Sequence, residues 1–513
     1  MNNQQTRKPN FSQSIFNLFQ YLFISERDPS YIYWMLAGIM LIGMIMRLWK
    51  INEPVAYDEA YTFIYFATKP FKQILSDYSA PNNHILHTIL VSISYKVLGG
   101  HTWIVRLPAF LAGTLCMPAG FFEARRIFNA NQSLAAAALI AFTPWLISYS
   151  ANGRGYTLLT LFALLLANFA GILVHKQTRT ALIAYGMTAA LGFYTIPIFM
   201  YPMAGISLWV LTTHLTASES RYDRSRKAWT FLVVCGLAAV LTLILYSPVI
   251  FFGTGAGSIL SNEIVEPRDW NNFVDKIGVR ALKTWEDWML NIAPFIQYVL
   301  LGGFLLSLFF YKKASKQRLP LAGFMALAML ILLLIQRVAP FPRVWIYLEA
   351  FYMLFAGAGL VWLVQILLRN AGKSVATEKI ISLVILLTVV VTFSVRYLNT
   401  RQPSMRANQP PEQYAAEFLA PRLTADDTVL SLAPVDYRTA YYLYMNGVPY
   451  EVFYQRDHPV EIQNAIIILR TTSEYNTPES VTDFFQLTSR LDLQRAEFLF
   501  EYGPLNIFSV PAK

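Results

Sequence analysis

The sequence predicts a polytopic α-helical membrane protein with a small α/β domain outside the membrane at its C-terminal end. Three observations predict this class. Of the 513 residues, 55% are hydrophobic and only 14% are charged, and the mean hydropathy is positive. Apolar runs long enough to cross a bilayer recur from Tyr33 to about Tyr397. The residues that follow have the composition of a soluble domain, with charges every few positions.

We expect about eleven membrane-spanning helices within a membrane domain that covers residues 33–398. The expected spans are 33–49, 103–121, 133–150, 157–174, 181–198, 200–214, 229–252, 293–311, 319–336, 344–368 and 378–397. Lys and Arg concentrate in every second connection, as the positive-inside rule requires. The basic connections contain Arg125 and Arg126, Lys176 and Arg179, residues 221–227, residues 312–318, and Arg369 with Lys373.

This alternation predicts a multi-pass protein of the inner (plasma) membrane with a cytoplasmic N-terminal segment, residues 1–32. One apolar stretch, 85–98, must stay out of the count. It is short and mixes His, Thr, Ser and Lys with apolar residues, which favours an interfacial helix over a span. The outer face then carries the first outer loop, 50–102, a second loop, 253–292, whose latter half is a candidate interfacial helix, and the C-terminal domain.

The C-terminal domain, residues 399–513, alternates helical and extended patterns. We expect helices at 411–419, 437–445 and 478–487 and strands at 428–432 and 465–469. No phosphate loop, metal-ligand spacing or nucleophile motif occurs in it. The sequence therefore leaves the task of this domain open.

Composition also excludes several classes of protein. The net charge of +10 comes from short clusters between apolar runs, so it is a topology signal and does not predict a nucleic-acid partner. The two cysteines, Cys116 and Cys235, lie in apolar runs and predict neither a disulfide framework nor a metal site. Residues 1–30 do not have the pattern of a cleaved signal peptide.

The most informative polar residues lie in the first outer loop. Asp58 and Glu59 follow the first span, and a carboxylate beside the bilayer can act as general base for an acceptor hydroxyl or hold a hard cation. The alternative is that both are solvated charges at a span end. His84 can orient a carboxylate or donate to a phosphate oxygen, whereas Asn82 or Asn83 is expected to cap the following helix. Asn83 is also a candidate substrate contact.

Several cations are predicted on the same face. Arg154, between Gly153 and Gly155 and two residues before Tyr156, can bind phosphate oxygens bidentately because glycines let the backbone approach closely. Arg343 stands at the outer end of a late span and is a second candidate. The further candidates for substrate binding are Tyr156, Arg280, Lys283 and Arg337. For each of these cations the alternative is a membrane-surface anchor.

The ordered motifs 57–61, 82–84, 106–113 and 150–156 resemble the GT-C glycosyltransferases of the glycosyltransferase family 39 type, which include protein O-mannosyltransferases and lipid A aminoarabinose transferases. The resemblance covers roughly 33–200 and continues more loosely to Arg343. It implies the GT-C fold and a polyprenyl-phosphate-linked sugar as donor, transferred with inversion to a glycan, lipid or protein acceptor outside the membrane. Asp58 would be the base, supported by Glu59, and Arg154 and Arg343 would contact the donor phosphate.

In one respect the sequence departs from that family. Members of the aminoarabinose type have a Lys-Pro-Pro segment after the first loop, where this chain has Asn83, His84 and Ile85, so the role of that lysine does not transfer and His84 becomes a catalytic candidate. No second acidic motif accompanies Arg154. We therefore expect no tightly bound metal or other cofactor, with a divalent ion left open.

Two other functions remain alternatives. A transporter or flippase for a lipid-linked glycan would also need cations at the headgroup, but it calls for polar residues within the spans, which here are nearly free of charge. A membrane scaffold whose outer domain binds a partner is the third.

Overall fold

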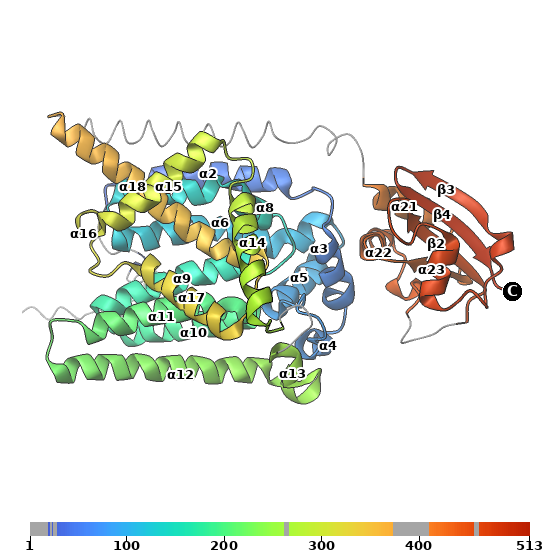
Figure 1. Ribbon diagram of the computed structural model, residues 1–513, viewed down its shortest axis with the longest axis horizontal. Helices are drawn as coiled ribbons and strands as arrows, with labels where there is room; N and C mark the ends of the chain where they lie inside the picture. The colour runs from blue at the N-terminus through green and yellow to red at the C-terminus, as the bar shows by residue number, and fades with distance from the viewer. Residues whose placement is uncertain (1–18, 21–22, 24–27, 261–265, 373–409, 456–460) are drawn as a thin grey trace, which may run out of the picture.

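In the computed structural model, residues 19–20, 23, 28–260, 266–372, 410–455 and 461–513 are described. Long helices form a bundle, and the C-terminal domain lies at one end of it, beyond α3 and α5 (Figure 1). We call this the domain end of the bundle.

Each of the first ten expected spans coincides with a helix or a bent helix pair. They are α2 (Ser30–Lys50), α6 (Thr102–Ile127), α7 (Ala130–Phe142) with α8 (Pro144–Ser150), α9 (Tyr156–His175), α10 (Arg179–Thr195), α11 (Met200–Leu215), α12 (Arg221–Phe252), α15 (Pro294–Phe309), α17 (Leu321–Gln336) and α18 (Ile346–Asn370). The third expected span is broken, with α7 and α8 bent by 60°. Pro144 opens α8 and cannot donate the backbone hydrogen bond that would continue α7. The eleventh expected span, 378–397, lies outside the described residues.

By length and composition, six helices of the described residues can cross a membrane, and seven if α7 and α8 count as one span. The helices at the other three of the ten expected spans, α10, α15 and α17, are shorter and have 16 or 17 residues. Small residues let the inner helices approach closely, which is how membrane helices pack without a hydrophobic driving force. A Cβ on Gly359 of α18 would lie 1.9 Å from the carbonyl oxygen of Gly303 in α15. No other residue fits at that crossing.

The basic connections gather at the end of the bundle opposite the domain end. The amide of Lys316 donates to the carbonyl of Ile127 at 2.7 Å, and Gln317 contacts the ring of His175 at 3.0 Å. On the same side, Gln177 donates to the carbonyl of Lys227 at 2.8 Å. The alternation of basic loops therefore corresponds to a real separation of two ends, whereas the assignment of those ends to cytoplasm and exterior stays a prediction.

The two long loops at the domain end contain the expected helices. The first outer loop forms α3 (Tyr57–Thr62), a π-helical turn at Phe63–Ala67, α4 (Phe71–Ser76) and α5 (Ile85–Leu98), and the second forms α13 (Gly255–Leu260) and α14 (Trp270–Trp288). The bounds of α5 are those expected, and α14 occupies the latter half of its loop. Their location at a bilayer interface stays a prediction.

The C-terminal domain is a four-stranded sheet with helices on both faces. Its elements are α21 (Pro411–Leu419), β1 (Asp427–Ser431), α22 (Asp436–Met445), β2 (Asn464–Arg470), α23 (Pro478–Phe485), β3 (Glu497–Tyr502) and β4 (Leu505–Pro511). The strand order is β1-β2-β4-β3, with β1 and β2 parallel and the other pairs antiparallel. The five expected elements are present, and β3 and β4 were not expected.

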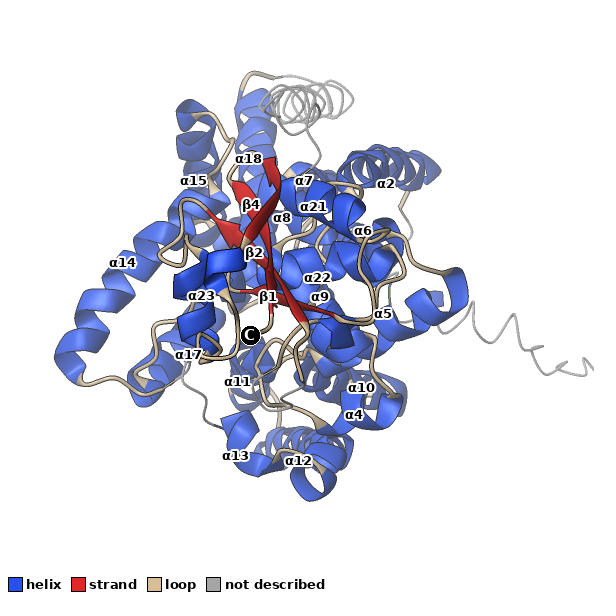
Figure 2. Cartoon of the chain, turned by 90° about the vertical axis from the view of Figure 1, so that its right-hand side faces the viewer, coloured by secondary structure: helices blue, strands red, loops and turns tan. Residues whose placement is uncertain are grey.

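Alternation along β2 explains how helices cover both faces of the sheet. Ile466 and Ile468 face α21 and α22, whereas Ile467 and Leu469 belong to the apolar cluster that contains Val481 of α23. Figure 2 shows α23 on one side of the sheet and α21 and α22 on the other.

Candidate functional site

Asp58 lies in the first turn of α3, where its side chain is 37% exposed. One of its carboxylate oxygens, Oδ2, lies 3.1 Å from Nη1 of Arg154 and 3.3 Å from Nη1 of Arg343. The three residues come from the first outer loop, the α8–α9 connection and the short 3₁₀ turn that precedes α18. The structure thus brings together the predicted base and both predicted phosphate ligands.

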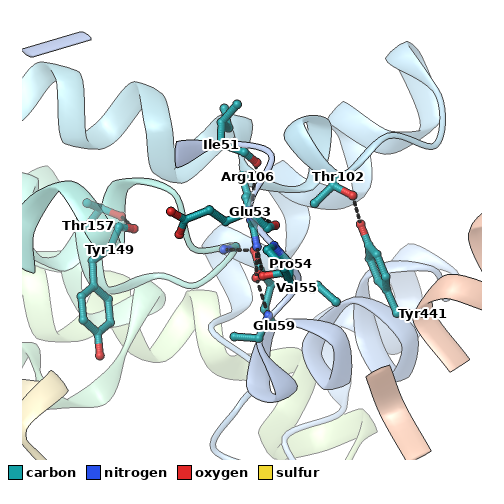
Figure 3. A network of polar contacts seen from close by, with 12 residues as sticks. Ile51, Glu53, Pro54, Val55, Glu59, Thr102, Arg106, Tyr149, Thr157 and Tyr441 are labelled. Carbon is teal, nitrogen blue, oxygen red and sulfur yellow. Dashed lines mark hydrogen bonds and ion pairs between the residues drawn. The ribbon is translucent and has the colours of Figure 1, made fainter. Parts of the chain in front are cut away.

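Glu59, the next residue, is buried and holds the loops together (Figure 3). Its oxygens accept hydrogen bonds from Nε and Nη2 of Arg106 at 2.6 and 2.7 Å, and from the backbone N–H of Gly153 at 2.7 Å. Because Glu59 is 1% exposed and Arg106 is 2% exposed, Glu59 does not reach substrate. It is a positioning residue that fixes the segment carrying Arg154.

Arg106 is the functional residue that sequence reasoning missed. Besides Glu59, its guanidinium donates to the carbonyls of Ile51, Glu53 and Pro54 at 2.7–3.1 Å. One buried arginine of α6 thereby ties the end of the first span to α3 and to the α8–α9 connection. The available signal was a cation inside an apolar helical run, which is uncommon without a partner.

His84 holds the backbone of the residue that follows Arg154. Its Nδ1 accepts a hydrogen bond from the backbone N–H of Gly155 at 2.9 Å, so the neutral ring carries its proton on Nε2, 3.4 Å from Nη2 of Arg154. Burial and the neighbouring Arg154 hold the pKa of His84 well below its usual range, which keeps the ring neutral. Because His84 is 2% exposed, we assign it to positioning the α8–α9 connection and not to direct contact with a ligand.

The expected capping of α5 by Asn82 or Asn83 is wrong. The helix begins at Ile85, so His84 occupies the cap position and no side chain makes a capping bond. Asn83 is fully buried and donates to the backbone carbonyls of Ile74 and Asp77 at 3.0 and 2.7 Å, which removes its amide group from the surface of the site. The Oδ1 atom of Asn82 instead lies 3.4 Å from Arg154.

Tyr156 and Arg280 lie beside the cluster formed by Asp58, Arg154 and Arg343. The two other candidates, Lys283 and Arg337, do not. The guanidinium of Arg154 lies 5.5 Å from the ring centre of Tyr156. Phe341 has Arg280 at 4.0 Å from its ring centre and Arg343 at 4.8 Å, so Arg280 reaches the margin of the site.

Lys283 pairs with Asp287 on its own helix at 3.1 Å. Arg337 lies 5.9 Å from the ring of Trp270. Neither contacts Asp58, Arg154 or Arg343 within the described residues.

Comparison with known proteins identifies the architecture. Residues 82–251 match the family model described as dolichyl-phosphate-mannose-protein mannosyltransferase. The crystal structure of ArnT from Cupriavidus metallidurans bound to undecaprenyl phosphate aligns over 94% of this chain and 98% of its own, with a TM-score of 0.60 and 13% identity. The chain has the GT-C fold.

A second structure with this GT-C fold is the archaeal oligosaccharyltransferase AglB from Archaeoglobus fulgidus, in complex with an inhibitory peptide and a dolichol-phosphate. It aligns over 93% of this chain and 74% of its own, with a TM-score of 0.51 and 11% identity. No curated protein is significantly similar in sequence. The resemblance seen in the sequence motifs is confirmed by the family model and by the fold.

The charge balance of this GT-C site favours an anionic ligand. Asp58 offsets one of two guanidinium charges, and neutral His84 adds none, so one positive charge remains in excess. Within the described residues, no three His, Cys, Asp or Glu side chains are grouped to hold a metal ion. The expectation that no metal is tightly bound stays untested.

Proposed function

We propose that the protein is an integral membrane glycosyltransferase that moves a sugar from a polyprenyl-phosphate-linked donor to an acceptor hydroxyl. The observation that carries the proposal is the contact of Asp58 with both Arg154 and Arg343 at the domain end of the bundle. ArnT and AglB, which share the fold, were solved with undecaprenyl phosphate and dolichol-phosphate, and these compounds are the leaving groups that such a donor would release.

The chemistry follows from the charges. The acceptor oxygen attacks the anomeric carbon and forms the new glycosidic bond, while its proton passes to the Asp58 carboxylate. The bond from the anomeric carbon to the phosphate oxygen breaks, and its electron pair stays on the phosphate. In the donor complex Arg154 and Arg343 contact phosphate oxygens in place of the Asp58 carboxylate, and they neutralise the charge that develops on the leaving phosphate. A single displacement inverts the anomeric centre.

The location of the reaction is part of the proposal. The basic connections gather at one end of the bundle, and the C-terminal domain and Asp58 lie at the other. If the basic end is cytoplasmic, as the positive-inside rule requires, transfer takes place on the outer face of the inner membrane.

The test uses the purified full chain in detergent. It is incubated with radiolabelled polyprenyl-phosphate sugars and membrane extract, and the label is followed into lipid, glycan or protein. Donor affinity should fall about 10- to 150-fold in Arg154→Ala and in Arg343→Ala, because each removes a charge-assisted contact worth about 1.5–3 kcal/mol. Lys276→Ala, an exposed cation of α14, is the matched control and should bind normally. Unchanged donor binding in both arginine variants would contradict the proposal.

One observation favours the alternative of a transporter or flippase. Glu349 in α18 is fully buried, and neither of its carboxyl oxygens has a hydrogen-bond partner in the described residues. Ionisable groups inside helical bundles often mark transport paths. The two functions can be separated by reconstituting the protein in vesicles that contain a fluorescent lipid-linked glycan. Movement of this lipid across the membrane without sugar transfer supports the transporter.

A further inference from the structure

A cleft opens between the first outer loop and the C-terminal domain. Its volume is about 390 Å³, within the roughly 300–1,000 Å³ typical of small-ligand sites. The side chains that line it and matter here are Tyr65, Lys69 and Gln73 from the loop and Tyr450, Glu451 and Gln455 from the domain. None of them was singled out in the sequence, and none belongs to the cluster around Asp58.

The two walls of this cleft are packed against each other as one unit. Val55, Phe63 and Val105 of the membrane domain share an apolar cluster with Tyr441 and Ile466 of the C-terminal domain. Hydrogen bonds cross the same junction. The hydroxyl of Tyr442 accepts from the N–H of Val55 at 3.2 Å, and the hydroxyl of Tyr441 donates to Thr102 at 3.2 Å. A cleft between walls held in this way is preformed for a ligand.

Tyrosine rings lead from Asp58 to the cleft. Tyr57, Tyr61 and Tyr65 follow at intervals of four along α3 and the π-helical turn, so they share one face. The rings of Tyr61 and Tyr65 stack at 5.3 Å with an interplanar angle of 8°. From the C-terminal domain, Tyr437 packs 4.5 Å from Tyr61 and 6.2 Å from Tyr450. All five rings are partly exposed, and the first is adjacent to Asp58 in the sequence.

The polar groups beside these rings carry little net charge. Lys69 lies 3.8 Å from Glu451, which balances its charge. Gln73 and Gln455 add amide groups that donate and accept hydrogen bonds. Near the start of the row, Asp436 accepts from the hydroxyl of Tyr57 at 3.4 Å, and its other oxygen, Oδ1, is buried with no hydrogen-bond partner in the described residues.

We propose that this tyrosine-lined cleft binds the carbohydrate part of the acceptor. Sugar rings present weakly polar C–H faces that suit the negative face of an aromatic ring, with hydroxyls around the edge for amides and carboxylates. A phosphorylated headgroup would need cations in excess, but Lys69 is offset by Glu451. A lipid tail would need an apolar wall, whereas four of the seven lining residues are amides or charged and the other three, Tyr65, Tyr450 and Phe453, are aromatic.

This inference rests on the proposed function in one respect: the acceptor must extend from the cleft far enough for its reacting hydroxyl to reach Asp58. There it forms the bond to the anomeric carbon of the donor sugar and gives its proton to the carboxylate, while the donor phosphate leaves with the bonding electrons. The row from Tyr65 to Tyr57 ends one residue from that carboxylate. An acceptor of several sugar units would therefore contact both places.

The test is a binding measurement that needs no activity. The purified full chain is titrated with neutral tetra- to hexasaccharides of glucose, mannose and N-acetylglucosamine, and saturation-transfer NMR gives the affinity. At least one should bind, and Tyr65→Ala and Tyr450→Ala should each weaken it about tenfold. Tyr65→Phe, which keeps the ring, should lose less. Tyr414→Ala is the matched control, because this ring stacks on Tyr502 at 4.2 Å in a separate contact.

Unchanged binding in Tyr65→Ala and Tyr450→Ala, with both variants folded by thermal unfolding, would overturn the inference. So would binding of anionic lipid vesicles or peptides at this cleft in place of the oligosaccharides. The two proposals fail in different ways. Oligosaccharide binding without transfer from any polyprenyl-phosphate sugar would refute the proposed function alone. Transfer to a glycan with an unchanged KM in the Tyr65→Ala protein would refute the cleft alone.

Discussion

Replacing Glu59 by glutamine tests how the site is held in place. Glu59 accepts four hydrogen bonds: Arg106 Nε and the Gly153 N–H donate to Oε1, while Arg106 Nη2 and the Ala56 N–H donate to Oε2. A glutamine oxygen can keep one pair, but its NH₂ group then faces two donors. The Glu59→Gln variant therefore loses two hydrogen bonds and leaves the Arg106 charge buried without an anion.

The expected cost is large because both partners are at most 2% exposed. Removing one member of a buried ion pair typically costs about 3–5 kcal/mol. Glu59→Gln should lower the free energy of unfolding by that amount, measured by denaturant unfolding in detergent. Sugar transfer should also fall, because the Gly153–Arg154 segment loses its anchor.

The neighbouring carboxylate supplies the control. Asp58 is 37% exposed, although its partner Arg154 is 3% exposed, so Asp58→Asn should lower the free energy of unfolding by less than Glu59→Gln does. The double variant Glu59→Leu/Arg106→Met removes both charges and should lose less stability than the sum of the two single variants. If Glu59→Gln unfolds with the wild-type free energy, or if Asp58→Asn loses as much, the division of roles between the two acids is wrong.

Two further predictions concern the residues around Arg154. A Cβ on Gly155 would lie 2.9 Å from Thr195 Cγ2 and 3.0 Å from the ring of His84, so Gly155→Ala should reduce sugar transfer. As the control, Gly278→Ala in α14 has open space around the new Cβ and should be neutral or slightly stabilising. Equal rates of sugar transfer in the two variants would contradict this packing. Burial lowers the pKa of His87 to about 3, so below pH 6.5 the unfolded chain binds more protons and stability falls as the pH falls. Between pH 7 and 5 this group should cost about 2 kcal/mol of unfolding free energy, and His87→Leu should flatten that slope; an unaltered slope would count against a buried neutral imidazole.

The sequence patterns that predicted most were those governed by local or regular rules. Hydropathy located the helices, and the composition of 85–98 gave α5 its bounds, because helix period and length are read directly from neighbouring residues. The basic loops predicted which connections gather at one end, and this placed Asp58, Arg154 and Arg343 at the other. A broken third span was not expected, although Pro144 was visible in it.

What was missed depends on contacts between distant parts of the chain. Glu59 and Arg106 are 47 positions apart, and no local pattern pairs them. The cap of α5 was misplaced by one or two residues, because Asn83 finds partners on α4 and the turn after it. Strand β3 lies at the edge of the sheet with Glu497 and Phe498 exposed, so it lacks the buried alternation that revealed β2. The tyrosine-lined cleft exists only where two domains meet.

The most direct test of the account is sugar transfer by Asp58→Asn. With a polyprenyl-phosphate sugar that the wild type uses, the rate should fall about 10²–10⁴-fold, as expected when a general base is lost. Donor binding should be retained or become tighter, because Arg154 and Arg343 no longer share their charge with a carboxylate. Asp275→Asn, an exposed acid of α14, should transfer normally. Transfer at the wild-type rate by folded Asp58→Asn protein would contradict the assignment of Asp58 as the base.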